Sequence, residues 1–291
     1  TPRDPFMVPK LTAAPLLYDK PIASIVAAPV RGRDGKLWFI AQESDEKSLQ
    51  VVLYDPATGH AEFRGDFQTA WRAAHSSEAA TMLPTQVKVA SSLVIANGGE
   101  VYFATNHAAA TGGPLSHVWR VTPSESGWKS VMSCESVLSA MAVGGESIYA
   151  WSANPPELWR SSGEGLAWRS LQLPVSNSSY ASRIFADDLG HVYLIDFPPV
   201  DEDLEEEHPV LVQLDGSLRE VGRSELPAHG KVTDRPLRGV VAEAALADGS
   251  RVFANDVGFL LKVTASDQSK LSLVEPLGWL HPLGMSRVEM L

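Results

Sequence analysis

The side chains that could bind a ligand or transfer a proton lie far apart in this sequence. Three aspartates and one histidine, Asp187, Asp188, Asp256 and His107, are of the types that bind cations or act as acids and bases. None of the eight histidines is paired with another at the spacing of metal ligands, so we predict no metal site and no cofactor. These four residues can form a ligand-binding site only where the fold brings them together.

The chain carries none of the short motifs that identify common enzyme classes. It has no Gly-x-Ser-x-Gly nucleophile turn, no His-Glu-x-x-His zinc motif, no phosphate-binding loop and no dinucleotide fingerprint. The paired glycines at 98–99 and 144–145 precede aliphatic and aromatic residues and are interpreted as turns that enter strands. The sequence therefore leaves open whether the protein is an enzyme.

The composition is that of a folded protein with an acidic surface. Of the 291 residues, 44% are hydrophobic, and 35 acidic residues outnumber 24 basic ones, which gives a formal net charge of −11. We therefore expect no binding to nucleic acid or to an anionic membrane surface. The single cysteine, Cys134, excludes an intrachain disulfide.

No membrane-spanning segment is expected. The longest uncharged run, Val101–Trp119, contains two glycines, a proline and Asn106, which a lipid-exposed helix would not carry so densely. The segment Thr1–Pro5 has no initiator methionine and no apolar signal-peptide core. It is compatible with the mature end of an exported protein, so we favour a secreted or periplasmic location slightly over a cytoplasmic one.

The elements that must position the candidate residues are the strands of a repeat. A glycine, one or two further residues, an aliphatic residue and then an aromatic one recur five times, 45 to 64 residues apart. The copies are Gly35–Phe39, Gly99–Phe103, Gly145–Tyr149, Gly190–Leu194 and Gly249–Phe253. In four copies an Asp or Asn precedes the glycine within three residues, which is typical of a turn before a strand.

Each copy lies between other strand-like segments. In the first repeat, small apolar residues at 22–27 precede it, residues 51–54 follow it, and a polar turn at 55–59 leads to a fourth segment. Four short strands in each unit of about 45 residues are typical of a β-propeller. We therefore predict an all-β fold class, a single β-propeller of four-stranded blades with five visible repeats and with six or seven blades as alternatives.

One propeller domain is predicted to span residues 1–291. Its repeats are placed at roughly 20–66, 87–133, 137–173, 181–224 and 238–277. The terminal segments could supply strands that close the ring. A helix is predicted only at Thr69–Met82, between the first two repeats, because this stretch is rich in alanine and amphipathic.

Two short segments resemble known propeller families. Ser161–Trp168 resembles the Asp-box of sialidase-type propellers, Ser-x-Asp-x-Gly-x-Thr-Trp, with Ser161, Gly165 and Trp168 in register and the motif's Asp and Thr replaced. The first repeat, Asp34–Ile40, is similar to the repeats of streptogramin-lyase-like propellers. Both resemblances imply the fold and neither implies an activity.

A sialidase would need a triad of arginines around the substrate carboxylate. Arg183 is followed by Ile184 and Phe185, so the proline of that family's Arg-Ile-Pro motif is missing. We keep Arg183 as a ligand-binding candidate, with a contact to a neighbouring blade as the alternative.

Tryptophans supply the remaining candidates. Trp128 and Trp168 recur in register forty residues apart and are predicted to be buried blade-packing residues. Trp71 and Trp151 lie outside the register, so they are predicted to contribute to a ligand surface, as aromatic side chains do in sugar and protein recognition.

Six carboxylates fall within Asp201–His208, inside the fourth repeat. A charge run of this kind is interpreted as a solvated loop, and a basic partner of the loop is the alternative.

The function predicted from these observations is binding. We expect a binding module that recognises a protein or carbohydrate through one end of the propeller axis, using Asp187, Asp188, Asp256, His107, Arg183, Trp71 and Trp151. The alternative is a propeller enzyme, a glycan hydrolase or lyase with acidic and arginine residues in its central channel.

Overall fold

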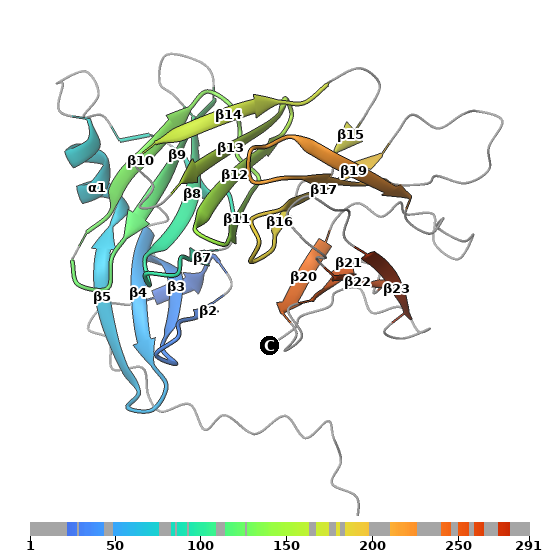
Figure 1. The fold of residues 1–291 in the computed structure, drawn as a ribbon. Helices are drawn as coiled ribbons and strands as arrows, with labels where there is room; N and C mark the ends of the chain where they lie inside the picture. Colours follow the sequence, from blue (N-terminus) through green and yellow to red (C-terminus); the bar gives the residue numbers. More distant parts are fainter. Residues whose placement is uncertain are drawn as a thin grey trace, which may run out of the picture.

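The structure is a computed structural model. It describes residues 22–27, 29–43, 49–75, 83–84, 86–91, 93–108, 114–125, 127–162, 167–174, 179–180, 184–197, 210–225, 240–245, 250–255, 259–264 and 273–279. Strands dominate these residues and form five antiparallel sheets, which Figure 1 shows around a common centre in chain order. We call them blades one to five.

The strands of each blade are consecutive in the sequence. Blade one contains β1 (Ile22–Ile25), β2 (Val30–Arg31), β3 (Leu37–Glu43), β4 (Leu49–Asp55) and β5 (His60–Asp66). Blade two contains β6 (Val87–Val89), β7 (Val94–Ile95), β8 (Val101–Ala108), β9 (Pro114–Val121) and β10 (Lys129–Cys134). Blade three contains β11 (Ala140–Gly144), β12 (Ser147–Ala153), β13 (Pro156–Ser162) and β14 (Trp168–Gln172). Blade four contains β15 (Ser179–Tyr180), β16 (Phe185–Ala186), β17 (Val192–Phe197), β18 (Val210–Leu214) and β19 (Glu220–Glu225). Blade five contains β20 (Val240–Ala245), β21 (Arg251–Asn255), β22 (Phe259–Thr264) and β23 (Leu273–Trp279).

The strands of each blade pair in the order in which they follow one another along the chain. Every strand pairs antiparallel with the next along the chain, from the first position to the fourth. In blades one, two and four the first position is split into two short strands that share one partner, for example β1 and β2 on β3. Neighbouring blades touch through their first strands, because β11 contacts both β7 and β16. The predicted all-β propeller with five repeats is confirmed.

The number of blades beyond five and the single-domain organisation stay predictions. Residues 1–21 and 280–291, which could complete the ring, lie outside the described residues. So does the acidic segment Asp201–His208.

The repeated glycine lies in the turn between the first and second strands. Gly35, Gly99, Gly145 and Gly190 have φ angles of 83°, 89°, 56° and 87°, in the left-handed region that glycine adopts without a Cβ clash. The aliphatic and aromatic residues that follow then begin the second strand of the blade.

The hydrophobic core lies between blades. Trp38, Val51, Phe103 and Trp119 belong to a buried cluster that joins blades one and two. A second cluster joins blades two and three, and a third joins blades three and four. Trp128 is 4% exposed within the first cluster, whereas Trp168 is only half-buried at the edge of the second.

The helix α1 (Phe67–Ala74) lies against β5 and β10, where blades one and two meet (Figure 1). Asp66 caps its N-terminus, because a side-chain oxygen of Asp66 accepts a hydrogen bond from the Thr69 N–H at 2.8 Å. Its buried face carries Phe67, Ala70 and Trp71. The helix begins two residues before the predicted Thr69, and residues 76–82 of the predicted segment lie outside the described part.

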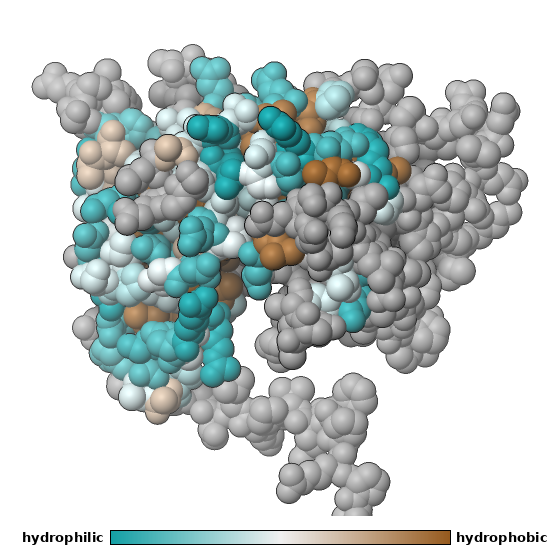
Figure 2. Space-filling model, in the orientation of Figure 1, coloured by the Kyte–Doolittle hydropathy of each residue, from teal (hydrophilic) through white to brown (hydrophobic). Residues whose placement is uncertain are grey.

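The surface drawn in Figure 2 is mostly hydrophilic, with hydrophobic residues in small separate patches. The large hydrophobic side chains that are exposed among the described residues are Ile25, Val26, Phe63, Val137 and Leu189.

Candidate functional site

A pocket of 510 Å³ opens between blades three and four. Three turns line it: the β11–β12 and β16–β17 turns, each joining the first and second strands of a blade, and the β18–β19 turn on the outer side of blade four. Arg160 on β13 completes the wall. All of these segments lie at one end of the propeller, the end that carries the repeated glycine turns.

The pocket is acidic. The described residues that line it include three acidic ones, Glu146, Asp188 and Asp215, and one basic one, Arg160. Glu146 and Asp188 are exposed and come from neighbouring blades. Because acidic residues outnumber the basic one in this described lining, the pocket favours a ligand that carries positive charge.

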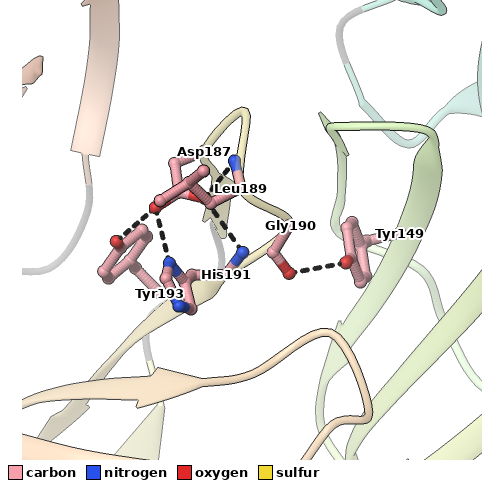
Figure 3. Close-up of polar contacts among 6 residues, drawn as sticks. All are labelled: Tyr149, Asp187, Leu189, Gly190, His191 and Tyr193. Carbon is pink, nitrogen blue, oxygen red and sulfur yellow. Dashed lines mark hydrogen bonds and ion pairs between the residues drawn. The ribbon is translucent and has the colours of Figure 1, made fainter. Parts of the chain in front are cut away.

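The wall on the side of blade four is held by a buried aspartate (Figure 3). One oxygen of Asp187 accepts hydrogen bonds from the backbone N–H groups of Leu189 and His191, both at 2.9 Å. The other oxygen accepts from the Tyr193 hydroxyl at 2.7 Å and from Nδ1 of His191 at 2.9 Å. Both oxygens of Asp187 therefore have partners, and Asp187 holds the turn in which the next residue, Asp188, lines the pocket.

His191 is fully buried and lines the same pocket. An ionised carboxylate only accepts hydrogen bonds, so Nδ1 must carry the proton that it donates to Asp187. The other ring nitrogen, Nε2, is buried and has no hydrogen-bond partner among the described residues. Figure 3 shows Nε2 on the side of the ring away from Asp187.

Arg160 is directed toward the wall of blade three. Its Nε donates a hydrogen bond to the Ser147 hydroxyl at 3.0 Å, and its positive charge acts on the nearby Tyr149. Burial raises the pKa of Tyr149, which keeps the hydroxyl protonated, and this hydroxyl donates to the Gly190 carbonyl at 2.9 Å (Figure 3). Tyr149 thus joins blade three to the turn of blade four.

The turns at this end of the propeller are also joined across blades one to three. Arg33 donates a hydrogen bond to the side-chain oxygen of Asn97 at 2.8 Å, and the Asn97 amide donates to the Gly145 carbonyl at 2.8 Å. These bonds fix the turn that forms the wall of blade three.

A second cluster of titratable side chains lies under α1. His75, His107 and His117 surround Trp71, with ring centroids 3.9, 4.9 and 5.3 Å from it. Burial, and then the charges of His117 and His75, lower the pKa of His107 to about 3. Burial and the charge of His75 lower the pKa of His117 to about 4. Both rings are therefore neutral at pH 7.

The structure separates the residues that the sequence singled out. Asp188 lines the pocket and Asp187 supports it, whereas His107 lies in the cluster under α1. Trp71 is 6% exposed and Trp151 fully buried, so both side chains pack in the core and neither forms an open aromatic surface. Their role in ligand binding stays a prediction.

Arg183 and Asp256 lie outside the described residues. Within the described part, no three His, Cys, Asp or Glu side chains are placed to hold a metal ion. No helix in that part is long and apolar enough to cross a membrane.

Sequence reasoning did not select Glu146, Arg160, His191 or Asp215 for this site. The repeat contains the signal that could have found three of them, because Glu146 and His191 directly follow the glycines of two copies and Asp215 begins the turn into β19. The sequence does not show that the three turns meet, because their meeting depends on how blades three and four pack together.

Comparison with known proteins identifies the fold. No protein-family model and no curated protein matches this chain. Solved structures do match, among them the Dos1 propeller, with 8% identity, a TM-score of 0.50 and coverage of 90% of this chain and 62% of that one. An oligogalacturonate lyase in complex with manganese matches with 9% identity, a TM-score of 0.51 and coverage of 86% and 64%. The chain is a β-propeller.

This propeller spans less than two thirds of the length of those two structures. A periplasmic gluconolactonase from Pseudomonas aeruginosa also matches, with 15% identity, a TM-score of 0.47 and coverage of 86% of this chain and 70% of that one. At these identities the similarity shows the fold alone.

Proposed function

We propose that this propeller is a binding module whose ligand enters the pocket between blades three and four. The observation that carries the proposal is the pocket itself, a 510 Å³ space at one end of the propeller whose walls are turns from two blades. Propellers commonly use loops at one end of the axis for recognition, since the strands beneath hold those loops in place.

The lining favours a protein ligand over a carbohydrate. Sugar sites commonly offer an aromatic face on which the sugar ring stacks, and the described residues that line this pocket include no Phe, Tyr or Trp. They are mainly acidic residues, serines and glycines instead, and side chains of these types bind the basic side chains and N–H donors of a protein surface.

Blocking the pocket tests this proposal. Ser217 is exposed at the rim, on the β18–β19 turn, and Ser124 is exposed on the corresponding turn of blade two, between β9 and β10. We would measure binding of the labelled protein to an array of glycans and to an array of peptides of varied charge. Ser217→Trp should weaken binding at least about tenfold, while the matched control Ser124→Trp should leave it unchanged. Equal binding by Ser217→Trp and the wild type would exclude the pocket as the recognition site.

A glycan hydrolase or lyase is the second candidate. It is favoured by the imidazole of His191, which Asp187 orients at the same pocket as Arg160 and three carboxylates, an arrangement suited to proton transfer. Incubation with polygalacturonate and with neutral oligosaccharides, followed by assay of new reducing ends and of unsaturated products, tests this candidate. Turnover that Ser217→Trp abolishes would make the protein an enzyme, and the absence of turnover in both assays would count against that candidate.

A further inference from the structure

We infer that α1 is released from the junction between blades one and two in mildly acidic solution, through protonation of His107 and His117 beneath it, while the blades stay folded. These histidines lie at the end of the propeller opposite to the repeated glycine turns. The release is therefore separate from binding at the pocket between blades three and four. It would expose the apolar face of the helix, which carries Phe67 and Trp71.

The rings of three histidines contact one another across the boundary between the helix and blade two. His75 is the C-terminal cap of α1, whereas His107 lies on β8 and His117 on β9. The ring centroids of His75 and His117 lie 5.1 Å apart, and those of His107 and His117 lie 5.2 Å apart. Trp71 of the helix stacks on His75 and contacts the other two rings edge-on. Two positive charges at these separations, away from water, repel each other.

The two buried rings also have no place for a second N–H. Nε2 of His107 lies 3.4 Å from the Thr105 hydroxyl, and Nδ1 of His117 lies 3.0 Å from the Ser130 hydroxyl. The other nitrogen of each ring is buried and has no hydrogen-bond partner in the described part of the chain. A protonated imidazole carries an N–H on both nitrogens. Protonation beneath the docked helix therefore buries an unpaired donor together with a charge, and release of the helix lets water reach both.

Charged groups on the elements around the cluster do not offset this cost. Glu62 and Arg64 on β5 form an ion pair with each other, Asp66 caps the first turn of α1, and Asp55 is at the end of β4 away from the helix. Further charged side chains are exposed or lie on the other face of β9 from His117: Arg72, Lys88, Arg120, Lys129 and Glu135. Within the described part, the charges that act on the two buried rings are those of the neighbouring histidines.

The direction of the pH effect follows from the two states of the helix. Burial, and then the charges of neighbouring histidines, lower the pKa of His107 to about 3 and that of His117 to about 4 while the helix is docked. A solvated imidazole has a pKa near 6.5, so the released state takes up protons first as the pH falls. If both rings become solvated, the equilibrium shifts toward release between pH 7 and pH 5 by roughly 25-fold for each histidine and roughly 600-fold for both.

Hydrogen–deuterium exchange followed by mass spectrometry at pH 7 and pH 5 tests the inference, with each rate divided by the intrinsic rate at that pH. The reporter is a peptide that spans α1, where the His75 N–H donates to the Trp71 carbonyl at 3.0 Å. A peptide that spans β12 of blade three is the internal reference.

Three variants separate the histidines of the cluster from other titrating groups. His107→Phe and His117→Phe each remove one titrating ring and keep an aromatic ring in the cluster. His60→Gln is the matched control, because His60 is exposed at the start of β5, at the end away from α1.

In the wild type, the protection of α1 should fall by at least about 100-fold from pH 7 to pH 5, or disappear. At both pH values β12 should stay at least about 100-fold more protected than α1, because the blades remain folded. Each phenylalanine variant should reduce the fall to roughly 25-fold, and His60→Gln should show the same fall as the wild type.

Three results would overturn the inference. One is equal protection of α1 at the two pH values. The second is equal protection of α1 and β12, which would show that the helix opens only when the whole propeller unfolds; both of these comparisons use the wild type and need no variant. The third is a fall in His107→Phe and His117→Phe as large as in the wild type, which would assign the effect to other groups.

Discussion

The junction between blades one and two is covered by a helix at the end opposite to the repeated glycine turns, whereas the junction between blades three and four opens into a pocket at the glycine-turn end. At the first, α1 covers the end of the junction and a group of rings closes it, with Phe67, Trp119 and Trp128 within 6.3 Å of one another. At the second, no helix is described, and the end of the junction opens into the polar pocket. The difference lies at the ends of the blades, since both junctions have a hydrophobic cluster between their sheets.

The buried polar groups of the two junctions are also arranged differently. Under α1, His107 and His117 are buried among rings, and each has a ring nitrogen without a hydrogen-bond partner in the described part. Beside the pocket, both oxygens of Asp187 are satisfied by two backbone and two side-chain donors. A histidine nitrogen beside the pocket, Nε2 of His191, is also without a described partner, so what distinguishes the open junction is a turn held by four hydrogen bonds to one carboxylate.

The largest expected effect concerns the closed junction. Trp128 lies 4.9 Å from Phe103 and 5.9 Å from Trp119 between ring centroids, so Trp128→Ala should lower the free energy of unfolding by about 3–5 kcal/mol. Trp168→Ala should cost about 1–2 kcal/mol, because that side chain is only half-buried. Urea denaturation followed by circular dichroism measures both. An equal cost for the two variants would contradict the distinction between them.

The second effect is a dependence of stability on pH at the closed junction. His107 and His117 have pKa values of about 3 and 4 in the folded protein, below the ordinary value near 6.5, so the unfolded chain binds protons first as the pH falls. Stability should therefore decrease from pH 7 to pH 5.5, by about 2–3 kcal/mol for the two residues together.

His107→Phe provides the control for this pH effect. A phenylalanine fits among Phe67 and Trp71, whose rings lie 5.4 and 4.9 Å from that of His107, and it removes one of the two titrating groups. The variant should lose about half of the dependence between pH 7 and 5.5. An unchanged dependence would assign the effect to other groups.

The smallest effect belongs to the open junction. Asp187→Asn keeps an acceptor for the two backbone N–H groups and removes the charge that strengthens four hydrogen bonds, so it should destabilise by about 1–2 kcal/mol. Asp34→Asn, at an exposed turn where one oxygen accepts from Lys36 at 3.1 Å, should change stability by less than about 0.5 kcal/mol. Thermal denaturation compares them, and a larger loss for Asp34→Asn would contradict the role given to Asp187.

The fold could be predicted from the sequence because its signals are local. A glycine with positive φ at residues 35, 99, 145 and 190, followed at once by apolar strand residues, is a feature that each repeat displays by itself. The strand pairing then follows chain order. The interaction of Asp187 with His191 and Tyr193 is also local, but the sequence does not show that it uses both oxygens and leaves none for a ligand.

The pocket could not be predicted in the same way. It requires β11 and β16 to come into contact, and this packing places Glu146 near Asp188, 42 residues later in the chain. The tryptophans outside the repeat register illustrate the same limit. Trp71 lies on the buried face of α1, a helix that belongs to no blade. Trp151 packs edge-on against Tyr180 of the next blade.

Gly144, at the end of β11, has a geometric consequence for the width of the pocket. A Cβ atom there would lie 2.5 Å from the Cβ of Ala186 and 2.7 Å from the backbone oxygen of Asp187, both closer than van der Waals contact allows. Any larger residue at position 144 would push blades three and four apart. Because Gly144 has no side chain, the backbones of the two blades approach each other as closely as their atoms allow. This approach determines how far apart the turns that carry Glu146 and Asp188 lie.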